Sequence, residues 1–476
     1  MKKRANNVRG LAAESVERRA SAARNLGIHA KAGLRRPTEL DVGLTWVREA
    51  AMRNRSLRFD NVLHHVTLSR LELAYWSLRK DAAAGVDEQD WASYGVGLAE
   101  RLMRVHQLVQ SGRYQPQPVL RQWALKPDGR KRPLGVTCVE DKVVQKALAG
   151  VLEAIFEVDF LGFSYGFRPG RSQHDALDAV YMAITTRKVS WVLDADIEAC
   201  FDRIEHSKLL AVLGRRIADR RVLRLIEQML DAGVVDEGTW QASKVGVPQG
   251  AVISPLLANV FLHDAIDRWV HGWRGRWARG MVSIVRYADD FVIGTQYRSD
   301  AVRLRTNLEK RLALYGLKLH PEKTRLIEFG RFAQANRGER GAGKPATFNF
   351  LGFTHCCATR RSDGDFALRR LSIAKRVRAF LQKVKEELQK RYAWSVAMQG
   401  SWLRSKVRGY FQYHGVPGNL GTLDTVRREI NRMWLRVLRR RSQRDDMTWE
   451  KLTRWVKRWI PSGKIVHPYP NQRFAF

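Results

Sequence analysis

The chain has 476 residues, of which 45% are hydrophobic, so it is long enough to form two or three domains with buried cores. Lysine and arginine number 84 against 48 acidic residues, and the formal net charge of +36 makes a polyanionic partner, above all nucleic acid, the leading expectation. No uninterrupted run of about eighteen apolar residues occurs, which argues against a membrane span and for a cytoplasmic protein. The four cysteines lack the spacing of a zinc site.

The N-terminal part of the chain predicts a basic extension followed by helices and a hairpin. Residues 1–40 are rich in Ala, Arg and Lys and have no sustained apolar stripe. From 41 to 112, apolar residues recur at helical spacing. The segment 114–136 predicts a β-hairpin, because a short apolar run is followed by the cationic turn KPDGRKR.

The middle of the chain combines helices with short strands that carry acidic residues. The apolar run 191–197 includes Asp196, and 281–295 consists of two apolar runs joined by the sequence YADD, which holds Asp289 and Asp290. Helices are predicted between these strands. The absence of a regular strand–helix alternation predicts an α+β fold and not a doubly wound parallel sheet.

The C-terminal part predicts a last pair of strands and then basic helices. The segments FNFLGFTHC and DFALRR form the strand pair, and the chain is predicted to become helical from about residue 371. Between 426 and 444, an apolar stripe of Val426, Ile430, Trp434 and Leu438 runs beside arginines. One face of this helix is expected to pack, while the other meets solvent or phosphate.

The three aspartates have the residue type that nucleotidyl transfer requires. This reaction uses two divalent ions, one at the attacking hydroxyl and one at the leaving pyrophosphate. Mg²⁺ prefers oxygen ligands and retains waters, so a few aspartates from neighbouring strands suffice. We expect Asp196 and Asp289 to bind directly and Asp290 to lie near the metals. YADD by itself would be interpreted as an ordinary hairpin turn.

Several long motifs together resemble the reverse transcriptases encoded by bacterial group II introns. They occur in the order and approximate spacing of that family, and the resemblance runs from about residue 45 to the C-terminus. The motifs are SYGFRPGRSQHDAL, DADIEACFDRI, GVPQGAVISPLLANVFLH, RYADDFVIG and GLKLHPEKTRLIEFG.

The resemblance implies roles for residues around the incoming nucleotide. Phe201 matches the position beneath the sugar, where a bulky ring would clash with a 2′-hydroxyl; the alternative is a core aromatic. Gln249 matches the residue that contacts the nucleotide, and Gly246 and Gly250 would allow close backbone approach. The alternative for Gln249 is an ordinary loop glutamine.

The resemblance also assigns cations to the triphosphate. Lys126 and Arg132 resemble finger residues that close on the phosphates, although Arg130 and Lys131 could take the same role and a solvated charged turn is the alternative. Lys323 matches a lysine that could protonate pyrophosphate, and is otherwise a surface lysine.

Other segments are expected to position nucleic acid. Arg168 and Arg171, among glycines, suit contact with the template backbone, and FNFLGF resembles the primer grip. The aromatic and basic stretch 402–419 resembles part of the thumb or maturase domain, although Trp402, Tyr410 and Phe411 are equally good core residues. The chain ends at Phe476 without the endonuclease domain that some relatives carry, so second-strand cleavage is not expected.

We therefore predict a right-hand polymerase with fingers and an antiparallel palm sheet, followed by an α-helical thumb. The predicted domains are 1–40, a basic extension; 41–365, fingers and palm; 366–445, thumb or maturase; and 446–476, a basic tail that could bind DNA. The expected cofactor is Mg²⁺, two ions, for which Mn²⁺ could substitute.

The predicted function is reverse transcription of a group II intron RNA, with help to its splicing and mobility. The expected partners are the intron RNA template, a DNA primer or target and deoxynucleoside triphosphates, with no membrane; the oligomeric state stays open. One alternative is a related enzyme domesticated for phage defence or linked to CRISPR. The other is an RNA-binding splicing chaperone in which polymerase activity is secondary.

Overall fold

The structure is a computed structural model that describes residues 39–125, 131–360, 362–440 and 447–473. The chain divides into two compact units. Unit 1 holds the described residues up to Ala176 together with Ala195–Ile293 and Ser299–Arg325; unit 2 holds Leu177–Asp194, Gly294–Arg298 and Leu326–Phe476. The basic extension predicted for 1–40 falls almost entirely outside the described residues.

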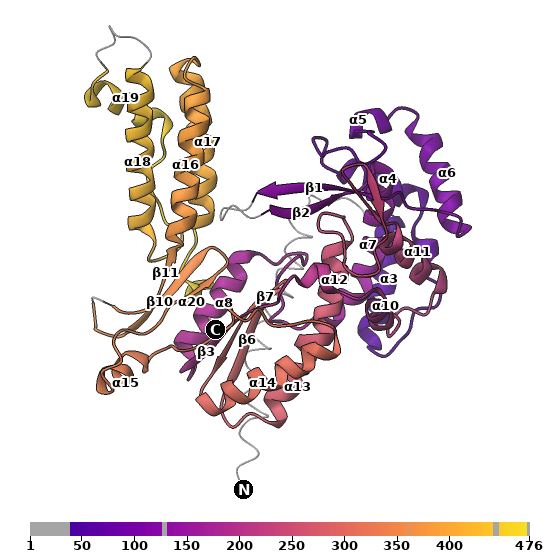
Figure 1. The fold of residues 1–476 in the computed structure, drawn as a ribbon, viewed down its shortest axis with the longest axis horizontal. Helices are drawn as coiled ribbons and strands as arrows, with labels where there is room; N and C mark the ends of the chain where they lie inside the picture. The colour runs from indigo at the N-terminus through magenta and orange to yellow at the C-terminus, as the bar shows by residue number, and fades with distance from the viewer. Residues whose placement is uncertain (1–38, 126–130, 361, 441–446, 474–476) are drawn as a thin grey trace. The chain divides into compact units, whose positions relative to one another are not determined.

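Unit 1 consists mainly of helices with short strands between them (Figure 1). Its helical elements are α3 (Glu39–Arg53), η1 (Leu63–His65), α4 (Leu68–Ser77), α5 (Trp91–Tyr94), α6 (Leu98–Gln110), α7 (Val139–Asp159), α9 (Cys200–Arg203), α10 (His206–Leu213), α11 (Arg220–Asp231), α12 (Ser254–Leu262), η2 (His263–Asp267), α13 (Arg268–Arg276) and most of α14 (Arg298–Leu314). Its strands are β1 (Val119–Leu125), β2 (Lys131–Val136), β4 (Val234–Asp236), β5 (Thr239–Gln241), β6 (Val282–Tyr287) and most of β7 (Asp290–Thr295).

The hairpin predicted for 114–136 is confirmed, and it belongs to a larger sheet. β1 and β2 pair antiparallel over their described length, from Leu120 opposite Val136 to Leu125 opposite Lys131. β1 also pairs in parallel with β4, so the strand order is β2-β1-β4-β5. The β4-β5 hairpin was not anticipated from the sequence, because three-residue strands carry too little periodicity.

The strands that carry the predicted metal ligands lie in one sheet. Its order is β6-β7-β3-β8, where β3 spans Trp191–Asp196 and β8 spans Arg325–Glu328. β6 and β7 are joined by only two residues, which makes them an antiparallel hairpin. Within unit 1, residues 163–165 run alongside β6: Tyr165 donates its N–H to the Arg286 carbonyl at 2.9 Å, and Ser164 and Arg286 form a parallel bridge.

Unit 2 contains a second small sheet and the C-terminal helices. Its elements are most of α8 (Gln173–Thr186), α15 (Ala333–Glu339), β9 (Phe348–Phe350), β10 (Phe353–Thr359), β11 (Phe366–Ser372), α16 (Ala374–Lys390), α17 (Val396–His414), α18 (Leu420–Arg439), α19 (Trp449–Trp459) and α20 (Pro470–Arg473). The predicted strand pair is confirmed as β9-β10-β11. Helix α16 begins at Ala374 and not at 371, because β11 continues to Ser372 opposite Phe353.

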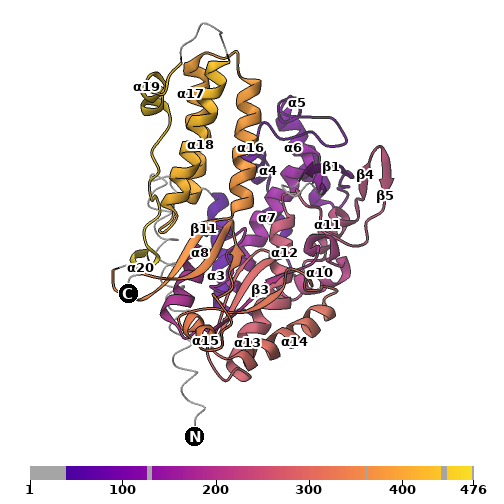
Figure 2. The ribbon, with the colours of Figure 1, turned by 60° about the vertical axis from the view of Figure 1, so that its left-hand side comes forward.

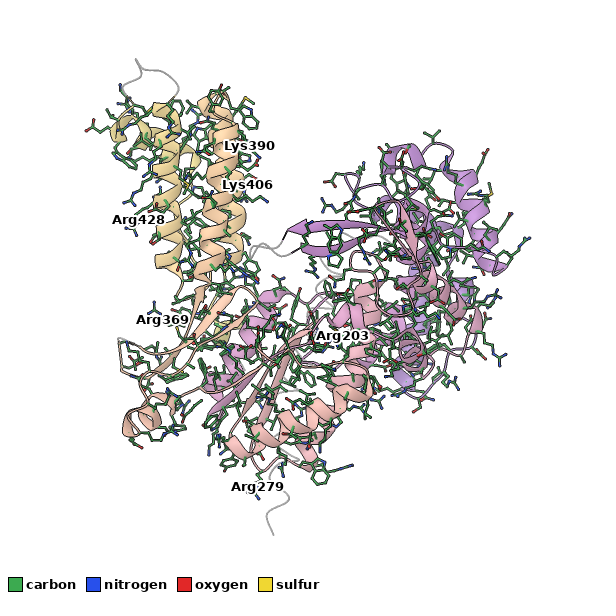
Figure 3. The ribbon with its side chains drawn as sticks, in the orientation of Figure 1. Arg203, Arg279, Arg369, Lys390, Lys406 and Arg428 are labelled. Carbon is green, nitrogen blue, oxygen red and sulfur yellow. The ribbon has the colours of Figure 1, made fainter. Side chains whose placement is uncertain are left out.

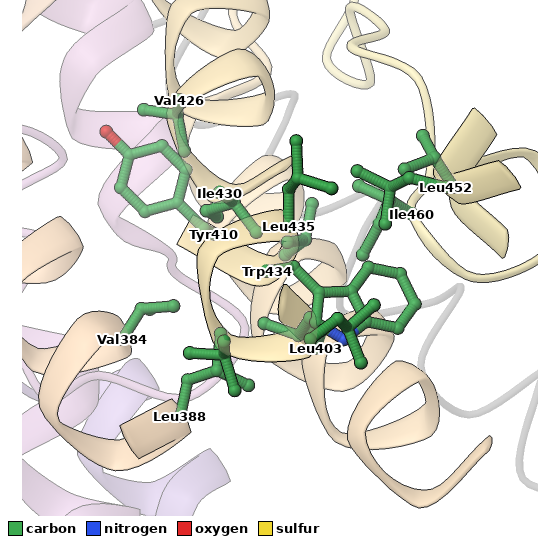
Figure 4. Packing of buried hydrophobic residues seen from close by; sticks show 14 of the residues in the cluster. Val384, Leu388, Leu403, Tyr410, Val426, Ile430, Trp434, Leu435, Leu452 and Ile460 are labelled. Carbon is green, nitrogen blue, oxygen red and sulfur yellow. The ribbon is translucent and has the colours of Figure 1, made fainter. Parts of the chain in front are cut away.

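The C-terminal helices share one hydrophobic core, and α16, α17 and α18 run side by side (Figures 1 and 2). The apolar stripe predicted on α18 is confirmed, since its four residues are at most 1% exposed. Figure 4 shows Val426, Ile430 and Trp434 within this core. The indole Nε1 of Trp434 donates to Gln399 Oε1 at 3.0 Å, so the buried ring keeps its polar atom satisfied.

The same core bears on the expected role of the aromatic residues in 402–419 and on the predicted end of the helical domain. Tyr410 and Phe411 are buried in it, and Trp402 packs against it, so these aromatics are core residues. Leu452 of α19 also belongs to the core, so the helical bundle continues beyond the predicted boundary at 445. No helix in the described part of the chain is long and apolar enough to cross a bilayer.

Candidate active site

Asp196 stands at the end of β3, and local backbone pairing brings Lys323 beside it. The backbone N–H of His320 donates to the Asp196 carbonyl at 2.8 Å, and an antiparallel bridge joins Ile197 to Leu319. Three residues after His320, the ammonium of Lys323 donates to the Asp196 carboxylate. The predicted metal ligand thus already has a positive charge next to it.

Asp289 lies in the two-residue connection between β6 and β7. It follows Ala288, whose left-handed φ of 57° is unusual for a residue with a Cβ. Burial raises the pKa of Asp289 above its ordinary value, and the charge of Asp196 raises it further, although Arg132 and Lys323 act in the opposite direction. Two carboxylates and two cations of unit 1 therefore lie within electrostatic reach of one another.

The donor chemistry of Asp196 and Asp289 fits a divalent cation. Mg²⁺ takes oxygen ligands and is commonly held by one or two carboxylates plus substrate phosphates. Such an ion would also relieve the repulsion between the two carboxylates. Among the residues that the structure describes, no group of three or more His, Cys, Asp or Glu side chains is arranged to hold a metal. Asp290, the first residue of β7, therefore stays a predicted third ligand.

Phe201 lies in the short helix α9 and is 9% exposed. Its carbonyl accepts from the N–H of Val247 at 2.7 Å, and the carbonyl of Ile204 accepts from Gly246 at 2.8 Å. These two hydrogen bonds fasten the loop that carries Gln249 to α9. Phe201 is thus largely packed and also adjoins the predicted nucleotide-contacting loop, so both interpretations of it stay open.

Gln249 is the centre of a chain of side-chain hydrogen bonds. Its Oε1 accepts from Arg132 Nε at 2.7 Å, and its Nε2 donates to Asp202 Oδ1 at 3.2 Å. The expected close backbone approach is present at Gly250, which has a φ of 121°: a Cβ there would lie 2.6 Å from the Gly135 carbonyl oxygen. The β1-β2 hairpin, the Gln249 loop and α9 are therefore connected through specific contacts.

Of the two predicted triphosphate ligands, Arg132 lies in the described part of the chain. Lys126 lies outside the described residues. Arg132 is in β2, exposed, and within electrostatic reach of Asp289. A guanidinium in that position is available for a phosphate group as well as for Gln249.

The two arginines predicted to contact the template lie in a loop that they help to hold together. The guanidinium of Arg168 donates to both carboxylate oxygens of Glu157 and, through Nη1, to the carbonyls of Leu161 and Ser164. Its side chain is only 4% exposed. Arg168 cannot reach a template phosphate without leaving these partners, and we do not propose it as a nucleic-acid ligand.

Arg171 is less enclosed than Arg168. It is half-buried, donates to the carbonyl of Gly162, and lies over the Tyr165 ring at 5.2 Å. Its role in template contact stays a prediction.

Two residues of the site were not singled out from the sequence. Asp202 directly follows Phe201 and accepts a hydrogen bond from Gln249. Because Gln249 lies 47 residues later in the chain, no local sequence pattern indicates this contact. Arg286 begins the motif RYADD and is buried against Asp267. In unit 2, Lys390, Lys406 and Arg428 project from α16, α17 and α18 and are exposed (Figure 3). Arg428 lies on the helix face that was expected to meet solvent or phosphate.

Comparisons with known proteins bear on this site directly. Residues 124–355, which contain all the described residues of the site, match the family described as reverse transcriptase (RNA-dependent DNA polymerase). The chain is 34% identical over 310 residues to protein YkfC of Escherichia coli, a match that covers 57% of the chain and 80% of that protein.

Two further relatives are named for introns. The group II intron-encoded protein LtrA of Lactococcus lactis is 37% identical over 172 residues, which is 36% of this chain and 28% of LtrA. The nuclear intron maturase 1 of Arabidopsis thaliana is 32% identical over 91 residues, which is 19% of this chain and 12% of that protein. The chain thus spans most of YkfC but less than a third of either intron protein.

Proposed function

This chain belongs to the family of reverse transcriptases encoded by group II introns, which are RNA-directed DNA polymerases, and we propose that it copies a group II intron RNA by two-metal nucleotidyl transfer. The observation that carries this proposal is that β3, which ends at Asp196, and β7, which begins directly after Asp289, are neighbouring strands of one sheet. Lys323 forms an ion pair with Asp196, and the charges of Asp196, Arg132 and Lys323 all act on Asp289. Two carboxylates and two cations are the groups that metal and triphosphate together need.

In this proposal, Asp196 and Asp289 hold the metal ions, with Asp290 as a third ligand. When bound, the ions favour deprotonation of the attacking 3′-hydroxyl and stabilise the leaving pyrophosphate. Mg²⁺ is the expected ion, with Mn²⁺ as a substitute. Burial of Asp289 strengthens its attraction for a cation, because the surrounding dielectric is lower than that of water.

The neighbouring residues bind and select the nucleotide. Arg132, together with Lys126, binds the triphosphate, and Gln249 orients Arg132 before the nucleotide arrives. Phe201 lies beneath the sugar and excludes a 2′-hydroxyl. Lys323 delivers a proton to pyrophosphate once its ion pair with Asp196 opens.

The partners of the reaction follow from the charge of the chain and from its relatives. The net charge of +36 and the exposed cations of α16, α17 and α18 support binding of an intron RNA template and a DNA primer. The names of LtrA and of the intron maturase support a second role in intron splicing and mobility. In that role the protein would act in the cytoplasm on its own intron, and splicing chemistry would belong to the RNA.

Extension of a DNA primer on an RNA template tests the polymerase proposal. Wild-type protein with Mg²⁺ or Mn²⁺ should extend the primer, and Asp289→Asn should abolish extension, because an amide cannot replace the carboxylate at a metal. Asp60→Asn is the matched control, because it makes the same isosteric substitution at an exposed aspartate of unit 1 that is not part of the predicted site. Full extension by Asp289→Asn would refute the proposal.

The splicing role is tested separately. Asp289→Asn should bind the intron RNA transcribed from the flanking DNA, and assist its splicing, as well as wild type does. Failure of the wild-type protein to stimulate splicing of that RNA would remove this second role without affecting the first.

A further inference from the structure

Behind the predicted catalytic turn, Arg286 of β6 is fully buried, and each of its five N–H donors has an acceptor. Nε and Nη2 donate to the two carboxylate oxygens of Asp267 at 2.7 and 2.6 Å. Nη2 also donates to Ser164 Oγ at 2.7 Å. Nη1 donates to Asn259 Oδ1 at 3.1 Å and to the carbonyl of Ala288 at 2.9 Å. A guanidinium held in this way has a single orientation, because the cost of moving it would be several broken contacts at once.

This guanidinium holds the turn by two routes. It binds the carbonyl of Ala288 directly. It also binds Asn259, whose Nδ2 donates to the Gly166 carbonyl at 2.6 Å. Gly166 in turn lies against the turn, since a Cβ there would be 2.4 Å from the Ala288 nitrogen. A left-handed alanine persists only where its surroundings hold it, and Arg286 and Gly166 provide such surroundings.

A π-helical turn explains how Asn259 and Asp267 both reach Arg286. The segment η2 (His263–Asp267) interrupts the α-helical register between α12 and α13, and the N–H of Arg268 bonds to the carbonyl of His263, five residues back. In an uninterrupted α-helix, residues eight apart differ by about 80° around the axis. The one-residue insertion of a π turn brings them close to one face, like residues seven apart, which differ by about 20°.

Burial alone would raise the pKa of Asp267, but the charge and hydrogen bonds of Arg286, aided by His263, lower it to about 2. Arg286 and Asp267 form a fully buried ion pair at 2.6 Å. The contacts of Arg286 with the turn are geometric, since the guanidinium binds a backbone carbonyl there.

We propose that Arg286 is a positioning residue that fixes the backbone of the Ala288–Asp289 turn and thereby sets the metal affinity of the active site. The inference rests on the proposed role of Asp289 as a metal ligand. Asp267 and Asn259 act in the same unit, since they hold Arg286 in place.

The test measures metal binding apart from catalysis. Mn²⁺ binding to full-length protein without nucleic acid is followed by electron paramagnetic resonance of the free ion, and the half-saturating Mg²⁺ concentration is taken from primer extension. The variants are Arg286→Lys, which keeps the charge but loses the planar fork, and Asn259→Ala, which is milder and suits a helix. Both should weaken Mn²⁺ binding by about tenfold, as loss of groups that orient metal ligands commonly does.

The matched control is Arg216→Lys. Arg216 is another buried arginine of unit 1, ion-paired with Asp159 at 2.9 Å and bonded to the carbonyls of Asn54 and Leu57. The variant Arg216→Lys should lower the thermal unfolding midpoint as Arg286→Lys does, but it should leave Mn²⁺ binding unchanged.

Asp289→Asn distinguishes failure of the positioning role of Arg286 from failure of the proposed metal site. If it abolishes Mn²⁺ binding while Arg286→Lys and Asn259→Ala bind as wild type, the positioning role is refuted and the proposed metal site stands. Equal weakening by Arg216→Lys would also refute it, because the effect would then be general destabilisation. If Asp289→Asn binds Mn²⁺ normally, the proposed metal site itself is wrong and the inference falls with it.

Discussion

The hydrogen-bond chain from Arg132 through Gln249 to Asp202 makes Asp202 a residue that should affect the efficiency of nucleotide incorporation. Asp202→Asn keeps the size of the side chain and removes the charge that strengthens its 3.2 Å bond to Gln249. Hydrogen bonds to charged groups contribute about 1.5–3 kcal/mol, against about 1 kcal/mol for neutral ones. Because Asp202 is exposed, solvent screens its charge, and we expect Asp202→Asn to weaken the bond to Gln249 by about 1 kcal/mol. That loss corresponds to about fivefold in kcat/KM for the nucleotide.

A double-mutant cycle measures this connection. Primer extension gives kcat/KM for the deoxynucleotide with Asp202→Asn, Gln249→Asn and the double variant, and the KM for the primer–template duplex serves as the internal control. The double variant should lose about as much as Gln249→Asn alone, a coupling of about 1 kcal/mol. If the two losses simply add, Asp202 does not act through Gln249. Asp60→Asn should leave every value unchanged.

Two further predictions concern selectivity and pH. Phe201→Val should raise the ratio of ribonucleotide to deoxyribonucleotide incorporation by about tenfold or more, because it removes the predicted clash with the 2′-hydroxyl. Single-nucleotide extension measures this ratio, and an unchanged ratio would mean that Phe201 is a core residue only. His355 of β10 is fully buried, and its burial, with the nearby charge of Arg370, lowers its pKa to about 3. In the unfolded chain this imidazole takes up a proton near its ordinary pKa of 6.5, whereas in the folded protein it stays neutral at that pH. The contribution of neutral His355 to the free energy of unfolding is therefore fully present above pH 6.5 and is lost as the pH falls. Between pH 7.5 and 5, the wild type should lose about 2 kcal/mol more free energy of unfolding than His355→Phe, measured by urea titration. Equal losses in the two proteins would contradict the lowered pKa of His355.

Local patterns in the sequence were sufficient for much of the architecture. The apolar stripe of α18 repeats every turn, so its burial follows from helical periodicity alone. β3, which ends at Asp196, and β6 and β7, which flank Asp289, are short apolar runs next to acidic residues, and such a pattern can be recognised from the local sequence alone. The cationic turn of the first hairpin could be recognised in the same way, although its tip, including Lys126, lies outside the described residues.

What the side chains contact was decided by tertiary structure. Arg168 and Arg171 have the same local context of glycines, yet Arg168 is buried against Glu157 while Arg171 keeps part of its surface. No sequence pattern distinguishes them, because the difference depends on which carboxylate the fold brings near. Arg132 likewise finds Gln249, 117 residues away, only because β2 and the Gln249 loop meet.

The fold class, the family and the acidic residues of the predicted metal site can be recognised in the amino-acid sequence, because periodicity and motifs are properties of short segments. That Asp202 binds Gln249, and that Asp267 and Asn259 hold Arg286, depends on the folded arrangement of distant segments. Their alignment depends on a π turn, whose extra residue changes which side chains share a face. Contacts of this kind arise from the packing of distant segments, so they exist only once the chain has folded.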